Sequence, residues 1–253
     1  MNSNANMNTY SLLFSSSLII ISIFFSYKEK LGLEKETLIG VIRAIVQLTL
    51  VGYVLDLIFN IENPIYTTLL LLFMTLNASY NAGKRGTGIK SKFIISFLSI
   101  FLGAFITLSI LLLAGTIKYE PSQMIPVGGM IISNAMIAIG LCYKQLLGNF
   151  KNKREEVEAK LALGADIKIS SVEIIRDSIK TGMMPTIDSM KTLGIVALPG
   201  MMTGLILAGT SPVEAIKFQL MVTFMMLSTT SISSYLACYL AYRGFFNERK
   251  QLL

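Results

Sequence analysis

A positive charge lies inside an apolar stretch of this chain. Arg43 falls within residues 38–59, and Gln47 follows one helical turn later on the same face. A charge at that depth in a bilayer is costly unless it reaches the headgroups, pairs with another group or faces water. Arg43 therefore either snorkels or holds a neighbouring helix, or it lines a translocation path with Gln47. Asp188 is a possible counter-charge.

Asn77 and Asn134 place amide groups in two further apolar stretches. Hydrogen bonds between helices explain them as well as contacts to a solute do. The chain also has 14 methionines, Met201 among them, and no histidine. Thioethers favour soft ions such as copper(I), but histidine is the commonest ligand for zinc, copper and iron. We interpret most methionines as flexible packing residues, expect no tight metal site, and leave the identity of any transported metal open.

The composition predicts an all-α, polytopic integral membrane protein. Of 253 residues, 53% are hydrophobic and only 15% are charged, far from the balance of a soluble domain. The basic residues lie in short segments between apolar stretches, so the net charge of +7 indicates membrane topology and not nucleic-acid binding. No GxxxxGK[ST] motif or catalytic constellation is present, so we expect a chain that is not an enzyme.

Seven apolar stretches are long enough to predict about seven transmembrane helices. Their limits are Tyr10–Tyr27, Leu38–Phe59, Ile65–Tyr80, Phe93–Ile117, Met124–Tyr143, Thr192–Ala208 and Ile216–Tyr242. Of the basic residues, only Lys118 and Lys217 fall in the segments that would lie outside. The positive-inside rule therefore places the amino terminus outside and the carboxyl terminus in the cytoplasm of a multi-pass plasma (inner) membrane protein without a cleaved signal peptide. Cys142 and Cys238 then lie near the reducing side, where we expect no structural disulfide.

A charged segment, residues 144–191, separates the fifth and sixth predicted spans of what we expect to be one permease domain over residues 1–253. It predicts two short amphipathic helices, the first ending at Gly164 and the second capped by Asp166. Such helices between membrane spans suit a docking element for a soluble partner, with Glu158 and Gly164 as coupling candidates. An ordinary interfacial loop is the alternative.

Three motifs carry a family resemblance. They are Pro185-Thr-Ile-Asp-Ser-Met-Lys-Thr-Leu-Gly-Ile-Val-Ala-Leu-Pro-Gly-Met-Met-Thr-Gly204, Arg43-Ala-Ile-Val-Gln-Leu48 and Pro126-Val-Gly-Gly-Met-Ile-Ile-Ser-Asn134. On these the chain resembles the bacterial iron-export ABC permease family (FetB type), to which the plant aluminium-sensitivity proteins are related. The resemblance implies a permease that dimerises in the lipid bilayer, binds no cofactor itself, and lowers intracellular iron using ATP hydrolysed by a separate, FetA-like subunit.

The resemblance also gives Glu158 and Gly164 a role. Their spacing is similar to the start of the coupling motif of importer permeases, but Arg176 and Asp177 stand where that motif continues with Leu-Pro. Two alternatives stay open at this point. The same architecture could carry an organic or nucleotide-sugar cargo, or the chain could be a secondary transporter that needs no partner. Arg43 would repel a bare cation and would suit an anionic chelate better.

Overall fold

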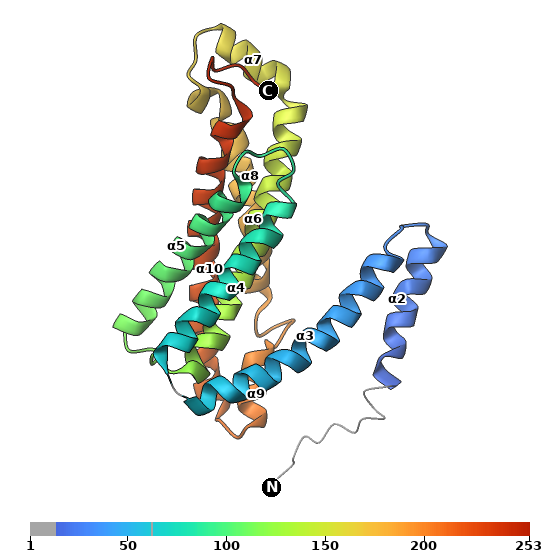
Figure 1. Ribbon diagram of the computed structural model, residues 1–253, viewed down its shortest axis with the longest axis vertical. Coiled ribbons are helices and arrows are strands. Elements are labelled where there is room, and N and C mark those ends of the chain that lie inside the picture. Colours follow the sequence, from blue (N-terminus) through green and yellow to red (C-terminus); the bar gives the residue numbers. More distant parts are fainter. Residues whose placement is uncertain (1–13, 62) are drawn as a thin grey trace. The chain divides into compact units, whose positions relative to one another are not determined.

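The structure is a computed structural model that describes residues 14–61 and 63–253. In that part of the chain all named elements are helices, which confirms the all-α prediction (Figure 1). The chain divides into two compact units at Ile61, and each is described by itself. The expectation of one permease domain stays a prediction.

The first unit contains a helical hairpin. α2 (Ser17–Lys28) and α3 (Glu34–Ile61) are joined by a tight turn. The Ser26 hydroxyl donates to Glu34 Oε1 (2.8 Å) and accepts from the backbone N–H of Leu33 (3.3 Å), so one side chain ties the end of α2 to the start of α3. The first predicted span begins outside the described residues.

The second unit is a helical bundle. α4 (Pro64–Lys84), α5 (Lys92–Leu113), α6 (Pro121–Asn152), α8 (Ile167–Thr192) and α10 (Pro212–Ala241) pack along one another, while α7 (Arg154–Ala162) lies at one end and α9 (Gly200–Leu207) at the other (Figure 1). A 3₁₀ turn, η1 (Tyr242–Phe245), follows α10. The core forms around fully buried side chains of α6, including Ile131, Ile139 and Tyr143.

Local signals explain where the bundle helices begin. Pro64, Pro121 and Pro212 each open a helix, where the missing N–H of proline is not needed. Asn63 and Ser211 add side-chain caps, accepting from the backbone N–H of Ile65 (2.9 Å) and of Glu214 (3.3 Å). Four described helices, α3, α5, α6 and α10, are long and apolar enough to cross a membrane, in agreement with the predicted membrane class.

The sixth predicted span, Thr192–Ala208, is wrong as a continuous helix. α8 ends at Thr192, the chain turns at Gly194 with φ +80°, and only the eight residues of α9 follow Pro199. Left-handed backbone at Gly194 and the missing N–H of Pro199 both interrupt helical hydrogen bonding. At about 1.5 Å per residue, α9 spans roughly 12 Å, too short to cross the hydrocarbon. By contrast, α6 continues through Pro126 without a break.

The charged segment also differs from the prediction of two short helices. α7 confirms the first, and Gly164 follows it with φ +89°, as a helix-ending glycine does. The second, α8, is wrong in length because it runs for 26 residues and packs against α6 and α10. Its buried face is made of small residues: Ser171, Ser178, Gly182 and Thr186 share it with Ile174 and Ile175. Small side chains let helices approach closely even where the sequence is polar.

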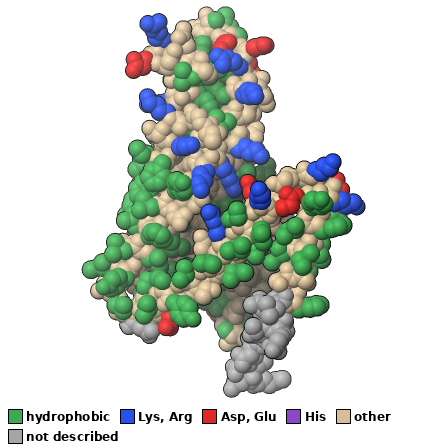
Figure 2. Space-filling view, turned by 45° about the vertical axis from the view of Figure 1, so that its right-hand side comes forward, with side chains coloured by type: hydrophobic (Ala, Val, Ile, Leu, Met, Phe, Trp, Pro, Cys, Tyr) green, Lys and Arg blue, Asp and Glu red, His purple; other side chains and the backbone are tan. Residues whose placement is uncertain are grey.

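Charge is unevenly distributed over the second unit. Figure 2 shows acidic side chains at the upper, narrow end, lysine and arginine side chains from that end down to the middle of the view, and hydrophobic side chains at the lower left. The side chains of α5 illustrate the apolar part: Ile94, Phe105 and Ile110 are all exposed. An apolar belt below a charged end is what a bundle needs to sit in a bilayer with one end in water.

Candidate functional site

Three helices of the second unit face one another along a line of small, polar and sulfur-containing side chains. α6, α8 and α10 contact each other pairwise. We call this line the three-helix seam. Its members are Asn134, Ala138 and Cys142 of α6, Gly182 and Thr186 of α8, and Met226, Thr230, Ser234 and Cys238 of α10. Within each helix these residues are four apart, which keeps them on one face.

A cavity of about 130 Å³ lies at one end of the seam, with Asn134, Thr186 and Met226 in its lining. Nδ2 of Asn134 donates to the Met130 carbonyl (2.8 Å) and to Met226 Sδ (3.4 Å), and no hydrogen bond to its Oδ1 is found within residues 14–61 and 63–253. The Thr186 and Thr230 hydroxyls are 3.5 Å apart. One water molecule takes up roughly 30 Å³, so a small, partly hydrated solute fits here.

The other end of the seam holds two buried free thiols. Cys142 and Cys238 contact each other beside Ser234. Gly182 lies directly against them: a Cβ at this position would overlap Cys142 Sγ, and would be 2.9 Å from the Ala138 carbonyl oxygen and 3.1 Å from Ser234 Oγ. Only glycine therefore permits α8 to approach α6 this closely.

The chemistry of the seam suits transient contact with a metal ion. Thiol and thioether sulfurs bind softer transition metals, whereas hydroxyl and amide oxygens replace parts of a hydration shell. Among the residues that the structure describes, no group of three or more His, Cys, Asp and Glu is placed to hold a metal ion. The sulfur and oxygen atoms of the seam are distributed singly along the three helices.

The remaining pathway candidates lie apart from the seam cavity or in the other unit. Arg43 and Gln47 belong to α3 of the first unit, so their role stays a prediction. Asp188, on α8, pairs with Lys191 at 2.9 Å within its own helix. Met201 is half-buried on α9 and packs against the core.

Asn77 is exposed on α4, where it accepts hydrogen bonds from Asn81 of the same helix. Its side-chain Oδ1 accepts from Asn81 Nδ2 at 2.7 Å, and its backbone carbonyl accepts from the same atom at 2.9 Å. Of the sequence-predicted pathway residues, only Asn134 lines the seam cavity.

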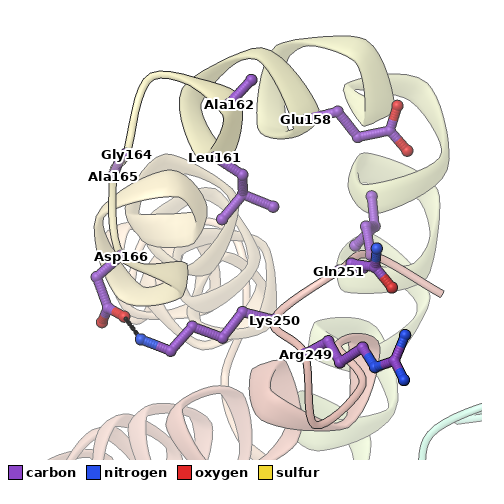
Figure 3. Close-up of a pocket in the computed structure, with 10 residues that line it drawn as sticks. Glu158, Leu161, Ala162, Gly164, Ala165, Asp166, Arg249, Lys250 and Gln251 are labelled. Carbon is purple, nitrogen blue, oxygen red and sulfur yellow. Dashed lines mark hydrogen bonds and ion pairs between the residues drawn. The ribbon is translucent and has the colours of Figure 1, made fainter.

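The two coupling candidates do come together. Glu158 and Gly164 line one pocket of about 680 Å³ at the charged end of the bundle, between α7, the start of α8 and residues 249–252. In Figure 3, Leu161 points into the middle of this pocket, while Lys250 extends along its opposite side toward Asp166. We call these five residues, Glu158, Leu161, Gly164, Asp166 and Lys250, the coupling surface.

Residues 246–253 fasten this surface to the bundle, an arrangement that the sequence does not indicate. Lys250 Nζ donates to Asp166 Oδ1 at 3.1 Å, and the Arg154 guanidinium donates to the backbone oxygens of Leu252 (3.4 Å) and Leu253 (3.2 Å). Arg154 also pairs with Glu158 at 2.8 Å. Arg154 therefore positions both Glu158 and the carboxyl-terminal tail, residues 246–253.

Exposed ion pairs determine the protonation of this region. The hydrogen bond from Lys250 lowers the pKa of the Asp166 carboxyl below its ordinary value. The contact between Glu156 and Lys160, 2.6 Å long, lowers the pKa of the glutamate and raises that of the lysine. Asp166 and Glu156 stay ionised and Lys160 stays protonated at neutral pH, so this end of the bundle carries charges of both signs.

Sequence reasoning missed most of the seam. Ser234 and Gly182 are small residues outside the three motifs, Thr186 was not singled out within its motif, and α8 was expected to be short. The available signal was the four-residue spacing of small side chains along α8 and α10, which is typical of closely packed membrane helices.

Comparison with known proteins relates the whole chain to one family. Residues 9–246 match the family described as "Uncharacterised protein family (UPF0014)". The chain is 51% identical over 253 residues to the "Probable iron export permease protein FetB" of Escherichia coli (strain K12), covering 100% of this chain and 97% of that protein. No solved structure matches the chain significantly.

More distant relatives come from plants and other bacteria. "Protein ALUMINUM SENSITIVE 3" of Arabidopsis thaliana is 37% identical over 235 residues, which are 93% of this chain and 86% of that protein. "UPF0014 membrane protein YjkA" of Bacillus subtilis (strain 168) is 36% identical over 246 residues, which are 97% of this chain and 98% of that protein. The resemblance carried by residues 185–204 and the two shorter motifs is confirmed, and the chain belongs to the UPF0014 family.

Proposed function

We propose that this chain is the membrane permease subunit of an ABC transporter that exports iron from the cytoplasm, with ATP hydrolysed by a separate ATP-binding subunit. The observation that carries the proposal is the 51% identity, over the full chain, to a protein named as a probable iron export permease. The three-helix seam supports it, because its cavity and its sulfur and oxygen ligands suit a small cation that must be released again.

The coupling surface is where the ATP-binding subunit docks in this proposal. α7 is a short helix that contributes the exposed Glu158 to this surface, and it follows α6 after a single residue, Lys153. A partner that pushes on α7 therefore acts directly on a helix of the seam. Two copies of the permease would present two such surfaces, which fits a homodimer with two ATP-binding subunits.

The arrangement of charge supports the proposed orientation. Gly244 lies against Lys90, because a Cβ on it would be 3.4 Å from the Lys90 backbone nitrogen, so two basic segments meet at one end of the bundle. In the segments expected outside, Lys118 pairs with Glu120 (3.9 Å) and Lys217 with Glu214 (2.7 Å), which leaves little excess positive charge there. This asymmetry supports a cytoplasmic location of the α7 end in the proposed orientation.

The test is iron(II) accumulation in inverted membrane vesicles that contain the chain, with and without its ATP-binding subunit. We expect accumulation that needs ATP and both subunits, and none with a catalytically inactive ATP-binding subunit. ATP hydrolysis by the pair without iron movement would overturn the cargo and favour an organic or nucleotide-sugar substrate. Iron movement without the partner would overturn the ABC assignment in favour of a secondary transporter.

Variants of the seam separate the cargo path from the fold. Met226→Leu keeps volume and removes the thioether, and Thr230→Val keeps shape and removes a hydroxyl. We expect both to lower ATP-dependent iron accumulation while the amount of protein in the membrane is unchanged. Leu220→Met, an exposed position on the same helix, is the matched control.

A further inference from the structure

We propose that the end of α4 binds the phosphate headgroup of an anionic phospholipid, held by Lys84 and Arg85 in a cavity against α6. This cavity, of about 310 Å³, is lined by Asn81, Lys84, Arg85, Met136 and Ile137. It shares Ile137 with the lining of the seam cavity and no residue with the coupling surface, and the proposal does not depend on the transported cargo.

Arg85 is positioned by the neighbouring helix. It lies across Gly140 of α6, where a Cβ would be 2.7 Å from its Cδ, 3.0 Å from Nη1 and 3.3 Å from Nε. The absence of a side chain at Gly140 thus lets the guanidinium lie flat on α6 beside the cavity. A planar guanidinium fixed in this way can donate two parallel hydrogen bonds to a phosphate.

Lys84 adds a second positive charge. Its Nζ lies 4.5 Å from the centroid of the Tyr80 ring, which keeps the ammonium at the cavity side of α4. None of the ion pairs found within residues 14–61 and 63–253 involves Lys84 or Arg85. Two neighbouring cations without a carboxylate attract an anion strongly where water is partly excluded.

The depth of the cavity matches a headgroup. Twenty residues separate Pro64 and Lys84 along α4, or about 30 Å at 1.5 Å per residue, which equals the thickness of the hydrocarbon core. Lys84 and Arg85 are therefore at the membrane–water boundary if Pro64 is at the other one. Basic pockets at this depth are typical sites for anionic lipids.

An apolar track leads away from the two charges. Ile137 is 45% exposed on α6, and Tyr80 (58%) and Phe73 (62%) are exposed about one and three turns before Lys84 on α4. An acyl chain can lie on these side chains while its phosphate stays at Arg85. A free phosphate ion would use only the polar half of the site, so the chemistry favours a lipid.

The experiment compares lipid retention by the purified full chain, using native mass spectrometry with phosphatidylglycerol, phosphatidylcholine and inorganic phosphate as probes. We expect wild-type protein to retain phosphatidylglycerol in preference to phosphatidylcholine. In K84Q/R85Q, two lost charge contacts should weaken that retention roughly 30-fold. The matched control K144Q/K151Q removes two exposed charges from α6 outside the cavity and should retain the lipid as wild type does.

Three outcomes would overturn the proposal. They are equal retention of both lipids by wild type, an equal loss in K84Q/R85Q and K144Q/K151Q, and displacement of the lipid by millimolar inorganic phosphate. R85K, which keeps the charge but not the planar fork, serves where the double variant fails to accumulate. It should lose part of the preference, and full wild-type retention by R85K would contradict the bidentate contact.

Discussion

At the scale of single residues, Gly182 determines how closely α8 lies against α6. The space that a side chain at this position would need is already occupied by Cys142 Sγ and the Ala138 carbonyl oxygen of α6. A small cysteine and a glycine thus form the tightest point of the seam, next to the cavity at Asn134. Gly182 both packs against α6 and lines the seam cavity, so substitutions must be chosen to test packing and transport separately.

Gly182→Ala is expected to destabilise the protein. The added methyl group overpacks the contact with Cys142, which typically costs about 1–3 kcal/mol and exceeds the helix propensity gained from alanine. Gly148→Ala is the matched control because it lies on α6 with no atom within 4 Å of its Cβ position. Thermal unfolding in detergent should show a lower Tm for G182A and an unchanged or higher Tm for G148A. A Tm for G182A equal to that of wild type would contradict the close approach.

The contact between Asp166 and Lys250 has a predictable pH dependence. Because Lys250 lowers the pKa of the carboxyl, the contact is fully formed above the ordinary pKa of 3.8 and is lost as pH falls through the lowered value. A spin label at Gln251→Cys should stay immobile from pH 7 to pH 4 and become mobile at lower pH. With Asp166→Asn the label should be more mobile throughout. Equal mobility in both proteins would show that Arg154 alone holds the tail.

At the scale of elements, α7 is where the structure connects the charged end to the bundle. Its buried residue, Val157, anchors it, and Arg154 links Glu158 to the tail. Leu161 also packs against the core, so the apolar side of α7 faces the bundle while Glu155 and Glu158 remain exposed. α7 is therefore exposed enough to meet a partner and is also attached firmly to the bundle.

Glu158→Lys is expected to weaken coupling to the ATP-binding subunit. The substitution replaces the ion pair with Arg154 by a repulsion and reverses one charge of the coupling surface, which should lower ATP-dependent transport at least about 10-fold. Glu155→Lys makes the same charge change on the same helix at a residue outside the pocket. Co-purification of the ATP-binding subunit and transport are the measurements. Equal behaviour of both variants would remove Glu158 from the coupling candidates.

The elements also show what sequence reasoning can and cannot provide. Long apolar stretches predict α3, α5, α6 and α10 because their composition alone requires burial in lipid or protein. Composition fails for α8, whose serines and threonine are buried by neighbouring helices, and for α9, where Gly194 and Pro199 break an apolar stretch. The seam follows from which helices are neighbours, and a single sequence carries almost no information on that.

At the scale of the whole molecule, basic residues for which no ion pair is found within residues 63–253 gather toward one end of the bundle. Lys90 lies against Gly244 there, whereas Lys118 and Lys217 elsewhere have acidic partners. Since lysine and arginine in short loops favour the cytoplasmic side, this distribution predicts the orientation with the α7 end inside.

Cysteine labelling in whole cells tests that direction. Lys118→Cys should react with a membrane-impermeant maleimide in intact cells, and Asn247→Cys only after permeabilisation. The native thiols, Cys142 and Cys238, are fully buried and should give little background. The opposite pattern would reverse the orientation and place the coupling surface outside, where no ATP-binding subunit could reach it.

The length of α6 has a mechanical consequence. Its 32 residues form one uninterrupted rod of about 48 Å, joined to α7 by a single residue at one end and carrying Asn134 near its middle. A rod of this length that tilts by about 10° around its centre displaces each tip by roughly 4 Å. In the proposed transporter, α6 is therefore expected to act as a lever arm that carries a push on α7 to the opposite end of the bundle.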